Sequence, residues 1–81
     1  MKVYIAAISI YDVEHDELQT DVLDNVCYTQ LKACNLAMDK IREMEKELFK
    51  VLMESWNDEP KVIEMIADLY RFNYLIKELN I

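Results

Sequence analysis

The chain has 81 residues, a formal net charge of −7 and a hydrophobic content of 53%. This length allows one small domain covering residues 1–81, and the apolar content excludes a disordered chain. There is no glycine, which excludes the glycine-rich phosphate loops of the common nucleotide-binding folds.

The first predicted element is a strand over residues 2–11, KVYIAAISIY. The run is apolar on both of its alternating faces, which is typical of a central strand covered on both sides. Its start is similar to a signal peptide, but an acidic stretch follows at once without a small-residue cleavage site. No apolar run approaches the roughly 20 residues that span a bilayer. The chain's two cysteines then indicate a reducing compartment, so we expect a cytoplasmic protein.

An acidic stretch follows, YDVEHDELQTD (11–21), with five carboxylates and the only histidine of the chain. We predict that it forms a hairpin connection to a second strand over 20–28, TDVLDNVCY. Asp16 can adopt the left-handed backbone geometry for which a glycine is missing. An alternative stays open, because apolar residues from Leu23 onward also have helical spacing, so that the first helix could begin near Asp21.

A long helix is predicted from the N-cap Thr29 to about Ser55. At ~1.5 Å per residue it would be about 40 Å long, so it should project beyond the sheet or bend. Its apolar stripe repeats at spacings of four and three residues and consists of Ala37, Ile41, Met44, Leu48 and Val51.

The segment WNDEPK (56–61) predicts a break, with Asn57 or Asp58 as the cap of a second helix and Pro60 in its first turn. The buried stripe of this helix is expected at Val62, Ile63, Ile66 and Leu69. Apolar and polar residues then alternate over 71–80, RFNYLIKELN, which favours a strand over an extension of the helix. The sequence therefore predicts an α+β domain of order ββααβ, with a three-stranded, mostly antiparallel sheet packed on a long and a shorter helix.

The acidic stretch does not match a known metal loop. A calcium loop that began at Asp12 would have Glu17 at its sixth position and Leu23 at its twelfth, where glycine and glutamate are needed. Zinc would have only His15, Cys27 and Cys34, without a close cysteine pair. Catalysis by a cysteine would need that histidine nearby and a third group to orient it. We expect no metal, no cofactor and no enzymatic activity.

The layout of charge predicts a binding surface. No Lys or Arg occurs from Val3 to Leu31, and outside this span ten acids face nine bases, which leaves a net charge of only −1 there. Such a layout argues against direct binding to nucleic-acid phosphates and allows a protein partner with a basic surface. The alternative that the stretch is only a solvated turn stays open. The expected partner-binding residues are Asp12, Glu14, Asp16, Glu17, Asp21 and Asp24, with Asp39, Glu43 and Glu47 of the long helix as secondary candidates.

The first strand also predicts an uncovered apolar surface, because two helices in so short a chain can cover only one side of a sheet well. The uncovered side would carry either Tyr4, Ile8 and Ile10 or Val3, Ile5 and Tyr11. Patches of this kind usually mark protein interfaces, and a symmetric dimer is the simplest way to bury one.

The segments MKVYIAAISIY (1–11), NVCYTQLKA (25–33) and NYLIKELNI (73–81) resemble the opening strand, the strand-to-helix passage and the terminal strand of a diffuse group of small acidic phage and mobile-element proteins, among them anti-CRISPR and other anti-defence proteins. The resemblance implies a non-enzymatic inhibitor or adaptor that blocks a host protein, such as a nucleic-acid-binding effector, by presenting acids where phosphates are expected. It carries over no functional residue, and the missing glycine and the long helix depart from it. The alternative function is a structural or regulatory homodimer that uses an apolar sheet face.

Overall fold

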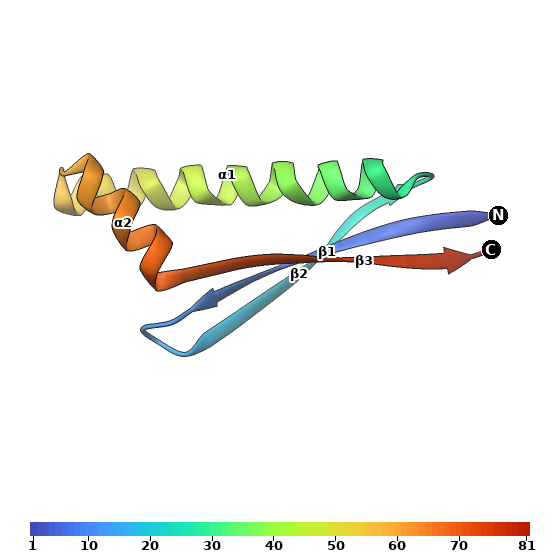
Figure 1. Cartoon of the computed structure of the whole chain (residues 1–81), viewed down its shortest axis with the longest axis horizontal. Coiled ribbons are helices and arrows are strands. Elements are labelled where there is room, and N and C mark those ends of the chain that lie inside the picture. The colour runs from blue at the N-terminus through green and yellow to red at the C-terminus, as the bar shows by residue number, and fades with distance from the viewer.

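The computed structural model describes the whole chain, residues 1–81, as an α+β domain of order ββααβ (Figure 1). The sheet is antiparallel in the order β2-β1-β3, with β1 in the centre, which confirms the predicted fold class. The elements are β1 (Lys2–Asp12), β2 (Glu17–Cys27), α1 (Gln30–Trp56), α2 (Glu59–Leu69) and β3 (Tyr70–Asn80).

The two ambiguous segments are both strands. The helix that could have begun near Asp21 is wrong, because Thr29 is the N-cap of α1 and its side chain accepts a hydrogen bond from the N–H of Lys32. The acidic stretch is only partly a connection, since β2 begins at Glu17, three residues before the predicted start. The turn itself is therefore short, residues 13–16, and most of the remaining acids lie on a strand.

Two residues take the left-handed conformation in place of glycine. Asp16 has φ 52° in the turn, and Asn57 has φ 47° where α1 ends. The N–H of Asn57 donates to the carbonyl of Met53 at 2.9 Å, and Asp58 then caps α2 by accepting from the N–H of Lys61 at 3.3 Å. Short side chains that tolerate this geometry thus allow sharp turns without glycine.

The buried core is small and lies mainly between β1 and the first half of α1, with Val62 of α2 buried separately. Only six of the 81 residues are buried. Ala6 and Ile8 of β1 contact Ala37 of α1, and the two small alanine side chains allow the helix to lie close to the sheet. Around them pack the half-buried Leu23, Ile41, Met44 and Ile76.

Beyond this core, α1 and the sheet diverge (Figure 1). The helix has 27 residues, and the molecule measures 49 × 22 × 16 Å. Two stripe assignments are wrong: Val51, on the diverging part of α1, is 57% exposed, and Ile63 of α2 is 54% exposed. Helical periodicity gives the side of a helix that faces its neighbour, but not the point at which that neighbour ends.

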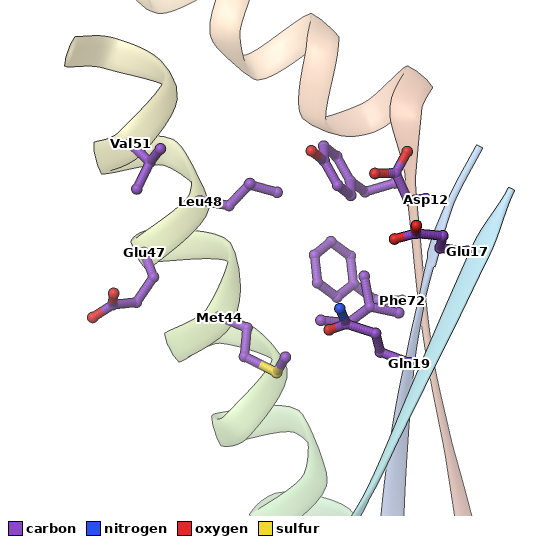
Figure 2. A pocket seen from close by; sticks show the side chains of 10 residues that line it. Asp12, Glu17, Gln19, Met44, Glu47, Leu48, Val51 and Phe72 are labelled. Carbon is purple, nitrogen blue, oxygen red and sulfur yellow. The ribbon is translucent and has the colours of Figure 1, made fainter. Parts of the chain in front are cut away.

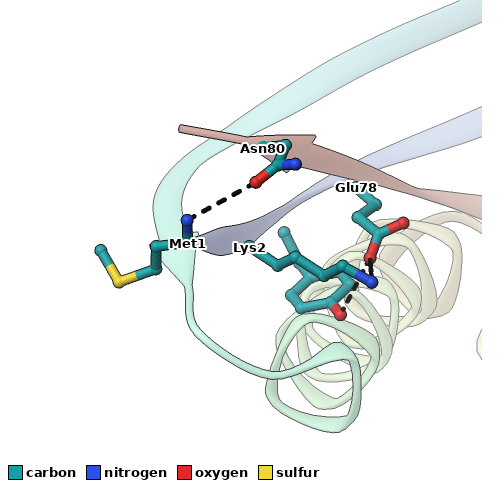
Figure 3. Close-up of polar contacts among 5 residues, drawn as sticks. Met1, Lys2, Glu78 and Asn80 are labelled. Carbon is teal, nitrogen blue, oxygen red and sulfur yellow. Dashed lines mark hydrogen bonds and ion pairs between the residues drawn. The ribbon is translucent and has the colours of Figure 1, made fainter.

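The chain termini lie together at the end of the sheet away from the hairpin turn (Figures 1 and 3). The Met1 ammonium donates to the carbonyl of Ile81 at 2.6 Å, and Lys2 pairs with Glu78 of β3 at 3.2 Å. The Tyr4 hydroxyl donates to the same carboxylate at 3.4 Å. These exposed contacts close the end of the β1–β3 pair.

Candidate functional site

The hairpin turn is held by its own side chains. Asp12 accepts a hydrogen bond from the backbone N–H of His15 at 3.2 Å, and its other carboxylate oxygen lies 2.9 Å from Nδ1 of His15. The Tyr11 hydroxyl donates to Asp16. The N–H of Val13 donates to the carbonyl of Leu69 at 2.9 Å, which ties the turn to the end of α2. The turn therefore presents its acids in a fixed arrangement.

These contacts shift the protonation of the turn. The hydrogen bond to Asp12, and then its charge, raise the pKa of His15. Partial burial alone would raise the pKa of Asp12, but the hydrogen bonds from the ring and backbone N–H of His15 outweigh it and lower that pKa. The hydrogen bond to Asp16 raises the pKa of the Tyr11 hydroxyl. The charged forms of Asp12 and His15 thus stabilise each other.

A groove opens where α1 and the sheet diverge, with a volume of about 380 Å³ (Figure 2). We call it the acidic groove. Its apolar lining comes from α1, β1 and the start of β3, and consists of Ile10, Met44, Leu48, Val51, Tyr70 and Phe72. Its polar lining consists of Asp12, Glu17, Gln19 and Glu47. Three carboxylates and no Lys or Arg therefore line an otherwise apolar groove.

The acidic groove contains three of the candidate residues, two from the same hairpin and one that is distant in the sequence. Asp12 and Glu17 face each other across the β1–β2 pair next to the turn, and Glu47 comes from α1. Asp21 lies nearby, in a smaller hollow that also contains Ile10 and Met44. Glu14 and Asp16 lie in the turn, and Asp24 is exposed on β2.

Asp39 and Glu43 do not join this group. They line a different hollow of about 780 Å³, between α1, α2 and β3, together with Arg42 and Lys46. Asp39 pairs with Arg42 at 3.2 Å, and Glu43 lies 3.9 Å from Lys40. The charges of Asp39 and Glu43 are balanced by these neighbouring bases. Of the secondary candidates, only Glu47 therefore belongs to the acidic groove.

The apolar half of the groove was not identified from the sequence. Leu48 and Val51 were assigned to the core stripe, and Phe72 and Tyr70 have no feature that separates them from core aromatics. The length of the predicted helix could have indicated them. A helix of 27 residues is longer than the rest of an 81-residue domain can cover, so part of its apolar stripe must remain accessible. The direction in which α1 leaves the sheet depends on packing and is not visible in the pattern.

No group of three or more His, Cys, Asp or Glu side chains is arranged to hold a metal ion. Cys27 and Cys34 are free and half-buried. The arrangement at the groove is suited to binding cationic and apolar groups together, because its carboxylates can accept hydrogen bonds while the side chains between them offer an apolar contact.

Comparisons with family models, with curated proteins and with solved structures gave no match. None of the helices combines the length and the apolar character that crossing a membrane would require.

Proposed function

We propose that this protein is a non-enzymatic inhibitor or adaptor that binds a basic surface of another protein through the acidic groove and the hairpin turn. The observation that carries the proposal is the acidic groove itself, whose lining includes Asp12, Glu17 and Glu47 beside apolar side chains and no basic residue. Asp12 and Glu17 lie on the sheet side, and Glu47 projects from α1 away from them (Figure 2). A groove of this composition is complementary to lysine and arginine side chains.

The complementarity extends to both parts of such a side chain. Lysine and arginine carry an apolar stem and a charged head. The stem would lie against Ile10, Leu48 and Phe72, while the head would meet Glu17 or Glu47. Hydrogen bonds between two charged groups are stronger than neutral ones, and this gives the contact its orientation.

The rest of the acidic surface steers the partner toward the groove. Glu14 and Asp16 are exposed in the turn beside the groove, Asp21 lies in the adjoining hollow, and Asp24 is exposed further along β2. The span from Val3 to Leu31 contains no Lys or Arg that would offset them. Charge layouts of this kind mainly raise the rate of association and make it sensitive to salt.

The class of partner rests on the resemblance to small phage and mobile-element proteins. It favours a host protein in the cytoplasm whose basic site normally binds nucleic acid, and an anti-defence role for this chain. The acids would then occupy the site in place of phosphates.

The test uses a short capped peptide in which leucine and arginine alternate, titrated into the isotope-labelled protein and followed by NMR. We expect the largest shifts at Ile10, Leu48 and Phe72, and weaker binding as salt rises, because salt screens exposed charges over about 8–10 Å. Replacing Glu17 and Glu47 by Gln should weaken binding roughly fivefold, about 1 kcal/mol for two exposed charge pairs.

The matched control is the double variant Asp39→Asn with Glu43→Gln, which removes the same charge from the other side of α1. It should bind the peptide almost as tightly as the wild-type protein. Equal losses in the two double variants would show that only net charge matters, and shifts that avoid the groove would refute the proposed site.

A further inference from the structure

The side of the sheet that faces away from α1 is uncovered (Figure 1). The strand register places cross-strand neighbours on this side in successive rows. Reading from β2 through β1 to β3, the rows are Leu18–Tyr11–Arg71, Thr20–Ser9–Asn73, Val22–Ala7–Leu75 and Val26–Ile5–Lys77. We call this surface the open face. Of the second alternative that the sequence predicts, Ile5 and Tyr11 belong to the open face, whereas Val3 is wrong as an uncovered residue because it is only 3% exposed.

The rows of the open face combine apolar with uncharged polar residues and contain no carboxylate. Two acids lie beside them: Asp24 falls between Val22 and Val26 where the register of β2 is irregular, and Asp16 accepts a hydrogen bond from the Tyr11 hydroxyl. Its large side chains reach solvent, with Leu18 65%, Val22 60% and Leu75 69% exposed. The chain has 16 acids, yet none of them occupies a position in these rows. The charged residues of the rows are Arg71 and Lys77, and both lie on the edge strand β3. The open face is thus separate in charge as well as in position from the acidic groove.

The exposed surface of the chain is larger than one compact domain should have. It amounts to 6081 Å², whereas the scaling of area with mass gives about 5,100 Å² for a compact monomer of 9.7 kDa. The radius of gyration is 15.0 Å, against about 12 Å for a compact domain of this length. The excess of about 1,000 Å² is close to the roughly 800 Å² that each partner buries in a stable interface of standard size.

We infer that the open face is the interface of a symmetric homodimer, in which two copies of the chain stack sheet on sheet. A second copy fits better than a basic partner, because Arg71 and Lys77 would repel such a partner. Two copies, each with a charge of −7, can approach through this face because no acid occupies a position in its rows. The inference does not rest on the proposed function, since the acidic groove is on the opposite side of the sheet.

Charge also selects the orientation of the two copies. A two-fold axis parallel to β1 places β2 of each copy over β3 of the other, so that the cations of the two copies lie at opposite margins of the interface. An axis across the strands would instead place β3 over β3 and bring Arg71 of each copy near Lys77 of the other. The first arrangement puts Val22 of each copy against Leu75 of the other, with Ala7 and Ser9 allowing close approach in the middle.

The test is sedimentation equilibrium of the full chain from low to high micromolar concentration, with circular dichroism to verify folding. We expect a species of twice 9.7 kDa. Val22→Lys and Leu75→Glu should each weaken dimerisation by at least roughly tenfold, because each places an unpaired charge among apolar side chains. Combining the two should restore much of the dimer, because each new lysine would face a new glutamate.

Ile63→Lys is the matched control, since it also places a lysine at an exposed apolar position but on α2, away from the open face. This variant should dimerise like the wild-type protein. A monomer at every concentration would overturn the inference. So would a dimer that persists in Val22→Lys, which would indicate pairing through a sheet edge, or one that Ile63→Lys alone disrupts. The double variant Glu17→Gln with Glu47→Gln should bind the peptide more weakly but dimerise like the wild-type protein, so that the failure of one proposal can be told from the failure of the other.

Discussion

At the scale of single residues, the hairpin turn shows what the sequence could and could not predict. The chain has no glycine, and this absence was enough to place Asp16 in the left-handed conformation that it adopts. The acids around His15 likewise predict that its charged form is favoured. The specific contact with Asp12, and that of Tyr11 with Asp16, depend on the shape of the turn and are not visible in the sequence.

The contact between His15 and Asp12 leads to a prediction about pH. The pKa of His15 is raised, so its contribution to stability is complete below about pH 6.5, the ordinary histidine value, and is lost as the pH rises through the folded value. The pKa of Asp12 is lowered, so its contribution is present above about pH 3.9 and is lost as the pH falls through the folded value. The stabilisation from this pair should therefore be largest between these two limits.

An NMR titration of the His15 ring tests this directly. The pKa should lie above the ordinary value in the wild-type protein and should fall in Asp12→Asn, which removes the charge and the strongest acceptor. Asp24→Asn removes the same charge from β2 and should leave the His15 pKa nearly unchanged. An unshifted His15 in the wild-type protein, or equal effects of the two substitutions, would contradict the contact.

At the scale of elements, the periodicity of apolar residues correctly predicted which segments are strands and which are helices. The errors in predicted burial arose where two elements diverge. The alternation over 71–80 predicted β3, and the stripe on α1 correctly identified the side that faces the sheet. Ile41 and Leu48, which this stripe predicts to be equally buried, are both half-buried but in different surroundings. Ile41 packs against the core cluster, whereas Leu48 lines the acidic groove.

This difference predicts unequal costs for the same substitution. Ile41→Ala should lower the free energy of unfolding by about 2 kcal/mol, the low end of the range for emptied core sites, because the side chain is only partly buried. Leu48→Ala should cost roughly half as much, since it enlarges a groove that is already open. Urea unfolding of both variants measures the two costs. A larger loss for Leu48→Ala would mean that α1 lies closer to the sheet than this structure has it.

At the scale of the whole molecule, a single observation connects the two surfaces. Only six of the 81 residues are buried, because α1 covers one side of the sheet and leaves it before the hairpin turn. The sequence predicts that one face of β1 stays uncovered. Which face this is depends on the side of the sheet on which α1 packs, and the sequence does not determine that side. A small domain buries a limited share of its surface, so a second copy on the open face would add substantially to its stability.

The last prediction follows from this link between association and stability. If the folded wild-type protein is a dimer across the range studied, a hundredfold rise in protein concentration adds about 2.7 kcal/mol per dimer. For a unit of that size this corresponds to an increase in melting temperature of roughly 5–10 °C. Val22→Lys should melt at a lower temperature that hardly depends on concentration, whereas Ile63→Lys should retain the wild-type dependence. A wild-type melting temperature that stays constant across this range would mean that the monomer is stable by itself with its open face in solvent.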